Sequence, residues 1–284
     1  MLNLRKLIYW FLAAVLLVCS SYLLTGCLEL LPEIFPELLP REAAGDHLLL
    51  GNPSLASSDP SNSKNYLIKT PQYALAYNAE QGTANWVSWQ LNKSWLGKVD
   101  RQDNFRPDDS LPEGWYQVTP ADYTNSGYDR GHLIPSADRT KTIEDNSATF
   151  LMTNIIPQTP DNNRGPWAEL ENYSRQLVDE GRELYIIAGG VGKKRAIAKG
   201  KVIPPSQVWK IIVALDRPGP GIQGINSQTR VIAVSIPNNQ GIKNKKWQSY
   251  RVSVDSLEQA TGYDFLRAVD PQIQAVLEAK VDRL

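Results

Sequence analysis

Two polar segments decide how this chain is interpreted, and the first reads Tyr128-Asp129-Arg130-Gly131-His132-Leu133-Ile134-Pro135. The second reads Asn154-Ile155-Ile156-Pro157-Gln158-Thr159-Pro160-Asp161-Asn162-Asn163-Arg164-Gly165-Pro166-Trp167. Both place charged and amide side chains where folding alone would not require them. Any chemistry that the chain performs is therefore expected in these two segments.

The first segment contains a candidate proton-transfer group. His132 is one of only two histidines among 284 residues, and histidine is the side chain best suited to move protons near neutral pH. Gly131 would let the backbone turn sharply beside it, and Asp129 and Arg130 could fix the loop by pairing with neighbours. A lone histidine satisfied within a loop is the more common case, so this segment alone leaves both possibilities open. His47 is expected to open a strand without polar company, in a structural or exposed place.

The second segment leads from a strand into a helix through a loop rich in amides. Asn162 or Asn163 could simply cap that helix or hold a turn. Asn163, Trp167, Glu171 and Arg175 follow one another at i, i+4 spacing and would lie along one helical stripe. Glu171 and Arg175 would then form a weak surface ion pair, or would present an acid and a guanidinium to a phosphate and its cation. Spacing alone does not decide between these uses.

The two segments together resemble one family. The run Asp129-Arg130-Gly131-His132, with Asn163 downstream and Glu171 eight residues further, is similar to the motif of the DNA/RNA non-specific endonucleases, which are ββα-metal (His-Me finger) enzymes. The likeness is strongest to the secreted sugar-non-specific nucleases of cyanobacteria and extends from residues 47–51 to residues 262–266. The resemblance implies a ββα-metal active-site motif and hydrolysis of phosphodiester bonds in DNA and RNA.

The resemblance also implies a role for each motif residue. His132 would be the general base that takes a proton from the attacking water. Asn163 would be the only direct protein ligand of one divalent cation, Mg²⁺ or Mn²⁺, and Glu171 would hold and orient one of the waters on that cation. The remaining implied roles are phosphate binding for Arg101 and Arg175, support of the site for Asp129 and Arg130, a share of the phosphate binding for Arg106, and orientation of His132 for Asn154.

Composition agrees with a hydrated metal ion and excludes several other classes of site. Mg²⁺ keeps several waters and accepts few protein ligands, so a site with a single asparagine is chemically possible. Zinc needs about four histidine or cysteine ligands, and the chain has no cluster of them: it has two histidines, and both of its cysteines, Cys19 and Cys27, lie in the predicted export signal. Thirty basic residues balance thirty acidic ones, which argues against binding nucleic acid through bulk positive charge.

The rest of the chain predicts one α+β domain over residues 46–284, with a mainly antiparallel central sheet flanked by helices. Short β-type runs are joined too tightly for helical crossovers, and apolar residues at helical spacing predict helices at 167–179 and 271–282. Trp86, Trp89 and Trp209 are expected in the core. The expected strands are residues 47–50, 66–69, 73–77, 86–91, 148–152, 183–188, 208–215, 230–236 and 250–254.

The first 27 residues predict an export signal. A basic start precedes an apolar run at residues 7–18, which is shorter than the roughly 20 residues of a membrane span. Leu23-Leu24-Thr25-Gly26-Cys27 resembles the bacterial lipobox, in which Cys27 becomes the acylated N-terminus; a plain signal peptide and an uncleaved anchor helix are the alternatives. Residues 28–45 are rich in proline and would form an extended tether. The expected location is the bacterial envelope as a membrane-anchored lipoprotein, or else a secreted or periplasmic one.

Two functions compete on these observations. The leading one is an exported, metal-dependent nuclease acting on DNA and RNA. The alternative is a non-catalytic, surface-anchored protein that captures nucleic acid, favoured by the lipobox and by the lysine-rich segments 193–201 and 243–246, although such runs are more often solvated loops. A metal phosphodiesterase for another exported substrate is a third possibility. The chain is expected to be a monomer, and a protein inhibitor would be a plausible partner because a stray nuclease endangers its producer.

Overall fold

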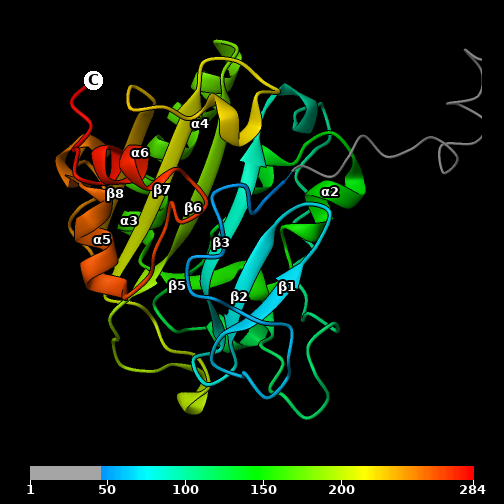
Figure 1. The fold of residues 1–284 in the computed structure, drawn as a ribbon. Helices are drawn as coiled ribbons and strands as arrows, with labels where there is room; N and C mark the ends of the chain where they lie inside the picture. The colour runs from blue at the N-terminus through cyan, green and yellow to red at the C-terminus, as the bar shows by residue number, and fades with distance from the viewer. Residues whose placement is uncertain (1–45) are drawn as a thin grey trace, which may run out of the picture. The chain divides into compact units, whose positions relative to one another are not determined.

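The computed structural model describes residues 46–284, which are built on a seven-stranded antiparallel sheet (Figure 1). The strand order is β1-β2-β3-β6-β7-β8-β9. β1, β2 and β3 pair in sequence order, and so do β6, β7, β8 and β9. β3 pairs with β6, and the chain between these two strands forms a long insertion. The strands are β1 (Tyr66–Lys69), β2 (Ala74–Asn78), β3 (Thr83–Leu91), β6 (Glu183–Val191), β7 (Gln207–Leu215), β8 (Arg230–Pro237) and β9 (Arg251–Val252).

Both faces of this sheet are buried, which explains why its central strands are almost continuously apolar. Along β6, Ile186 packs into the core on one face and Ile187 into the core on the other. Leu170 and Leu177 of α4 (Ala168–Asp179) cover the first face. The opposite face is covered by α5 (Val254–Thr261) and α6 (Pro271–Glu278), which lie across the sheet from α4 in Figure 1. Trp86, Trp89 and Trp209 are fully buried, as expected.

The insertion between β3 and β6 carries a second, two-stranded sheet. β4 (Asp129–His132) pairs antiparallel with β5 (Ile155–Gln158). The chain then passes through α3 (Pro160–Asn162) and a π-helical turn, η5 (Asn163–Trp167), into α4. The result is a ββα unit whose helix packs on the large sheet. The predicted α+β fold with this motif is therefore confirmed.

Short helical elements fill the remaining connections. Three of them lie between β4 and β5 and shape the site described below: η3 (Ser136–Asp138), α2 (Ile143–Ala148) and η4 (Met152–Asn154). The others are η1 (Lys93–Trp95), η2 (Pro120–Tyr123), η6 (Ala198–Gly200), η7 (Gly221–Gly224) and η8 (Trp247–Tyr250).

Several predicted elements were wrong. Residues 47–50 form a turn, and residues 148–152 cover the end of α2, a turn and the start of η4, not a strand. β4, β5, α2 and α5 were not predicted. Of the expected strand at 250–254, two residues form β9, Tyr250 ends η8, Ser253 caps α5 and Val254 begins it.

His47 was expected to lack polar partners, but its ring makes two hydrogen bonds. Its Nε2 donates to the carbonyl of Pro71 at 2.9 Å, and its Nδ1 accepts from the backbone N–H of Gln90 at 3.2 Å. The imidazole is buried, and burial together with the Arg139 charge lowers the pKa of His47 to about 4. His47 is therefore a neutral structural residue that fastens the first turn to the sheet.

Among residues 46–284 no helix is both long and apolar enough to cross a bilayer. The predicted signal peptide, the lipobox cysteine Cys27 and the tether at 28–45 lie outside the described residues.

Candidate active site

The β4–β5 hairpin fixes His132 at its end. His132 pairs with Ile155, and the chain directly beyond it is held by Asn154. The Asn154 side chain accepts from the N–H of Ile134 at 3.0 Å and donates to the carbonyl of the same residue at 2.9 Å. Asn154 therefore orients the backbone that follows His132; it does not bond the imidazole itself.

Gly131 serves close packing between two strands. It lies within β4, opposite Ile156, and the sharp turn expected beside His132 is absent. A Cβ at this position would lie 2.2 Å from Oε1 and 2.6 Å from Cβ of Gln158 on β5. Only glycine lets the two strands and the Gln158 side chain approach this closely.

The imidazole of His132 packs against two phenylalanine rings that also contact each other, with 4.9 Å between their centroids. The ring centroids of Phe105 and Phe150 lie 5.3 and 5.0 Å from that of His132. The side chain is 8% exposed, and its Nε2 is buried with no hydrogen-bond partner among the described residues. Burial, with the nearby charges of Arg101 and Arg130, lowers the pKa of His132 to about 3. The imidazole is therefore neutral at ordinary pH and has an unused nitrogen.

Each of those phenylalanine rings also contacts one arginine. The guanidinium carbon of Arg101 is 4.8 Å from the centroid of Phe150, and that of Arg130 is 4.4 Å from the centroid of Phe105. The histidine and the two phenylalanines therefore form a triangle of rings, and each phenylalanine also contacts one arginine. This arrangement puts two positive charges beside a neutral base.

Arg106 has a different environment from Arg101. Its guanidinium donates to the backbone carbonyl of Ser147 at 2.8 Å, which ties the loop before β4 to the end of α2. Arg101 donates instead to the hydroxyl of Ser136 at 3.0 Å and pairs with the exposed Asp103 at 2.7 Å. The structure therefore brings Arg101 to His132 and gives Arg106 a bond that fixes a loop.

Asn163 is brought to the hairpin by Asp129. The Asn163 side chain donates its Nδ2–H to Asp129 Oδ2 at 2.9 Å, and Arg164 forms a forked pair with the same carboxylate at 2.7 and 2.8 Å. Because the amide nitrogen is engaged, the amide oxygen is the atom that remains for a ligand. Trp167 adds a second link, donating its Nε1–H to the carbonyl of His132 at 3.3 Å.

The helix that carries these residues is interrupted, contrary to the predicted stripe. Asn163 to Trp167 form a π-helical turn in which Gly165 has φ −118° and ψ −118°. Pro166 has no N–H to continue the α-helical ladder. The backbone of Lys243 fills the space beside Gly165, where a Cβ would lie 2.5 Å from its carbonyl oxygen. Asn163 is therefore out of α-helical register with Glu171 and Arg175.

Of the two uses left open for Glu171 and Arg175, their mutual ion pair is not formed. Arg175 pairs with the buried Asp138 of η3 at 2.7 Å and donates to Asn172 at 2.6 Å. Glu171 faces Lys210 of β7, with 3.7 Å between the ammonium and its Oε1. Burial raises the pKa of Glu171, and the charges of Lys210 and Arg175 act against that rise. Glu171 and Arg175 are thus each paired with a residue of another element.

Sequence reasoning missed Phe105, Phe150, Asp138 and Lys210. Nothing in the sequence marks Phe105, Phe150 or Asp138 as site residues, because isolated aromatic and acidic residues are common. Lys210 did give one, because it is the single charge in the apolar run of β7.

The donor atoms suit a hard, hydrated cation. The amide oxygen of Asn163 and the carboxylate of Glu171 are oxygen donors, which Mg²⁺ and Mn²⁺ prefer. Within residues 46–284 the one cluster of three acidic, histidine or cysteine ligands is Asp255, Glu258 and Glu278, on α5 and α6. The candidate site therefore offers few protein ligands to an ion, as a mostly water-filled shell requires.

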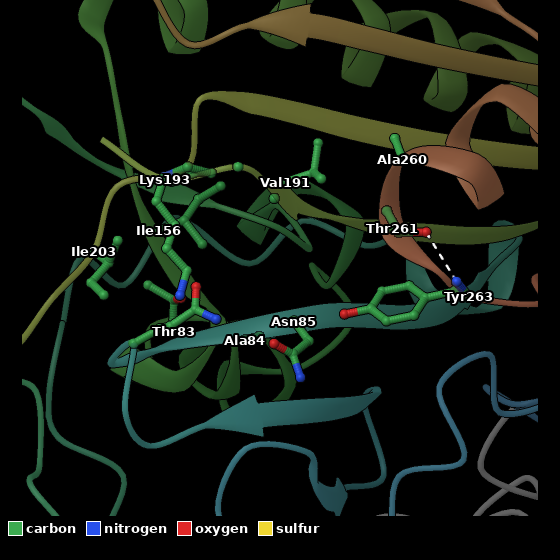
Figure 2. A pocket seen from close by; sticks show the side chains of 14 residues that line it. Thr83, Ala84, Asn85, Ile156, Val191, Lys193, Ile203, Ala260, Thr261 and Tyr263 are labelled. Atoms are coloured by element: carbon green, nitrogen blue, oxygen red, sulfur yellow. Dashed lines mark hydrogen bonds between the residues drawn. The ribbon is translucent and has the colours of Figure 1, made fainter. Parts of the chain in front are cut away.

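The surface has one hollow beside the candidate site and another cavity away from it. A hollow of about 200 Å³ beside the hairpin is lined by Tyr128, Asp129 and Arg130, among others. A separate cavity of about 170 Å³ (Figure 2) is lined in part by Asn85 and Tyr263, and none of the candidate site residues lines it. The chemistry is therefore expected at the hairpin.

A ββα unit with a neutral histidine on its hairpin, and an asparagine and a glutamate on its helix, defines the class of ββα-metal nucleases. The chain belongs to the DNA/RNA non-specific endonuclease family, whose model matches residues 50–272. The predicted family is confirmed, and the chain is a non-specific endonuclease.

Individual relatives support this assignment. The chain is 58% identical to a nuclease of Nostoc sp. over 92% of its length and 94% of that protein. It is 29% identical to human mitochondrial endonuclease G, covering 68% of this chain and 67% of that one. The crystal structure of the EndoG/EndoGI complex shares the fold, with a TM-score of 0.68, 22% identity, and coverage of 82% of this chain and 94% of that one.

Proposed function

We propose that this chain is an exported, divalent-metal-dependent, sugar-non-specific endonuclease that hydrolyses phosphodiester bonds of DNA and RNA. One observation carries the mechanism: His132 is neutral, its Nε2 has no hydrogen-bond partner among the described residues, and the charges of Arg101 and Arg130 are nearby. A neutral imidazole can accept a proton, and arginines beside it favour an anionic substrate at that place.

His132 acts as the general base in this proposal. Its free nitrogen takes the proton of the water that attacks the phosphorus, a role that contributes about 10²–10⁴-fold to the rate. The two phenylalanine rings hold the imidazole plane, and the hairpin holds its backbone. Arg101 and Arg175 bind the phosphate; Arg130 and Asp129 support the site.

Asn163 and Glu171 would hold one Mg²⁺ or Mn²⁺, Asn163 directly and Glu171 through a water. The family is one of divalent-metal-dependent enzymes. When bound, such an ion stabilises the negative charge that develops on the phosphate and on the leaving oxygen. Asp129 fixes the Asn163 amide so that its oxygen is presented to the ion. Because every group named here addresses a phosphate or its cation, base sequence and sugar type are expected to matter little.

Replacing His132 tests the catalytic role. His132→Ala should lower the rate of plasmid cleavage in Mg²⁺ by at least a hundredfold while the circular-dichroism spectrum stays that of the wild type. His47→Gln, which removes the other histidine, is the matched control and should retain cleavage. Full cleavage by a folded His132→Ala variant would refute the assignment.

The nucleic-acid capture function is tested by the same protein. Wild-type protein and DNA are incubated with and without EDTA and separated by electrophoresis. Shortened DNA without EDTA and intact DNA with EDTA support the nuclease; retarded but intact DNA in both supports capture.

Export, anchoring and partners complete the proposal. Residues 1–27 act as a lipoprotein signal, Cys27 is acylated, and the chain is a monomer in the bacterial envelope. Cys27→Ser should move the protein from the detergent phase to the aqueous phase in a detergent partition. A protein inhibitor is a further proposed partner, supported by the related fold in a structure titled as a mechanism of EndoG inhibition.

A further inference from the structure

Lys210 is a charged residue in the middle of the large sheet. It lies on β7 opposite Ala188 of β6 and Val234 of β8, and its side chain is 1% exposed. The ammonium lies 4.1 Å from the ring centroid of Trp167 and 5.5 Å from that of Trp89. A buried lysine is costly unless its charge is paired, so its partner is informative.

The partner is the glutamate of the candidate site. Glu171 is the one carboxylate within ion-pair distance of Lys210 among the described residues, at 3.7 Å. Glu171 has another cation at hand, because Arg175 follows it by four residues on α4, a spacing at which such pairs normally form. Arg175 is nevertheless paired with Asp138, which is itself fixed by a hydrogen bond from Trp89 Nε1 at 3.1 Å.

We infer that Lys210 is a positioning residue for the nuclease site: it holds the Glu171 carboxylate on the sheet side of α4, so that Arg175 stays with Asp138, in the place from which it binds the substrate phosphate. The two tryptophans keep the ammonium in place, since its attraction to their rings adds to the ion pair. Without the ammonium, Glu171 is left buried beside Arg175 and pairs with it. This inference rests on the proposed function, in which Arg175 binds phosphate.

The test measures binding and needs no cleavage. A fluorescein-labelled DNA duplex is titrated into the full chain in EDTA, and anisotropy gives the Kd of the wild type, Lys210→Met, Glu171→Gln and the double variant. Lys280→Met is the control, because it removes one lysine from an exposed place. We expect Lys210→Met to weaken binding about tenfold and Lys280→Met to stay within about threefold of the wild type. The double variant should bind at least about threefold more tightly than Lys210→Met, because a neutral glutamine cannot draw Arg175 away from Asp138.

Three results would overturn the inference. Unchanged binding by Lys210→Met shows that the lysine has no effect on Arg175. A double variant as weak as Lys210→Met shows only structural damage, and tenfold tighter binding by Glu171→Gln shows only an effect of net charge. If Lys210→Met does not fold, recovery of folding in the double variant supports the pairing, and a double variant that also fails to fold refutes it. A wild type that neither binds nor cleaves DNA removes the proposed function as well.

Discussion

The two histidines make a quantitative prediction about stability in acid. Both are buried, with pKa values of about 3 for His132 and about 4 for His47, against about 6.5 in an unfolded chain. Between these values the unfolded state holds a proton that the folded state lacks, so each histidine stabilises the fold above pH 6.5 and loses that contribution as the pH falls. Lowering the pH from 7 to 4 should remove about 3 kcal/mol per histidine.

The measurement is urea unfolding in EDTA at a series of pH values, for the wild type, His132→Gln, His47→Gln and the double variant. Each single substitution should reduce the slope of unfolding free energy against pH by about 1.4 kcal/mol per pH unit between pH 4.5 and 6, and the double variant by about twice that. The differences between curves are the readout, because Glu278, whose pKa burial raises to about 7, acts on the wild-type curve in the opposite direction.

Parallel curves for the wild type and the His132→Gln variant would refute the reasoning. They would mean that the imidazole titrates alike in the folded and unfolded states, so that it is neither desolvated nor held neutral. The argument for a general base that stays unprotonated in mild acid would then fail.

Three further changes test the site. Asp129→Ala should weaken Mn²⁺ binding measured by calorimetry by about 10–100-fold, since the Asn163 amide loses the acceptor that orients it; unchanged affinity would remove Asp129 from the site. Gly131→Ala should lower the unfolding free energy by about 1–3 kcal/mol, because its Cβ would overlap β5; a wild-type urea midpoint would contradict that packing. Gly165→Ala should slow cleavage at least tenfold, because its Cβ would push against backbone and shift Asn163; an unchanged rate would show that the turn tolerates movement.

Much of the large sheet was predictable because its strands follow simple rules. β1 was predicted to the residue, since turn-forming residues bound a short apolar run. β4 and β5 were missed because they hold an Asp-Arg-Gly-His run and a proline, and only their mutual pairing makes them strands. α5 carried readable signals, a serine cap at Ser253 and Gly262 in the left-handed conformation, that the expected strand at 250–254 obscured.

The candidate site was predictable only where a motif named its residues. The positions of His132, Asn163 and Glu171 came from the resemblance, and their roles stay predictions. What the sequence did not contain was the pairing of charges: Lys210 is 39 residues from Glu171, and their contact depends on the register of β7 and the rotation of α4. The break at Gly165 was signalled by Pro166, but the angle it imposes comes from the loop that packs against it.

The nearness of Arg101 and Arg130 to the neutral imidazole of His132 has a consequence for kinetics. Removing either guanidinium takes away a positive charge that attracts the substrate. It also raises the pKa of His132, because that charge disfavours protonation of the imidazole. The rates of such variants compared at a single pH therefore combine the change in substrate affinity with the change in the pKa of His132. Full curves of rate against pH separate the two effects. Weaker substrate binding lowers the rate at every pH, whereas an altered pKa of His132 shifts the pH at which the rate changes.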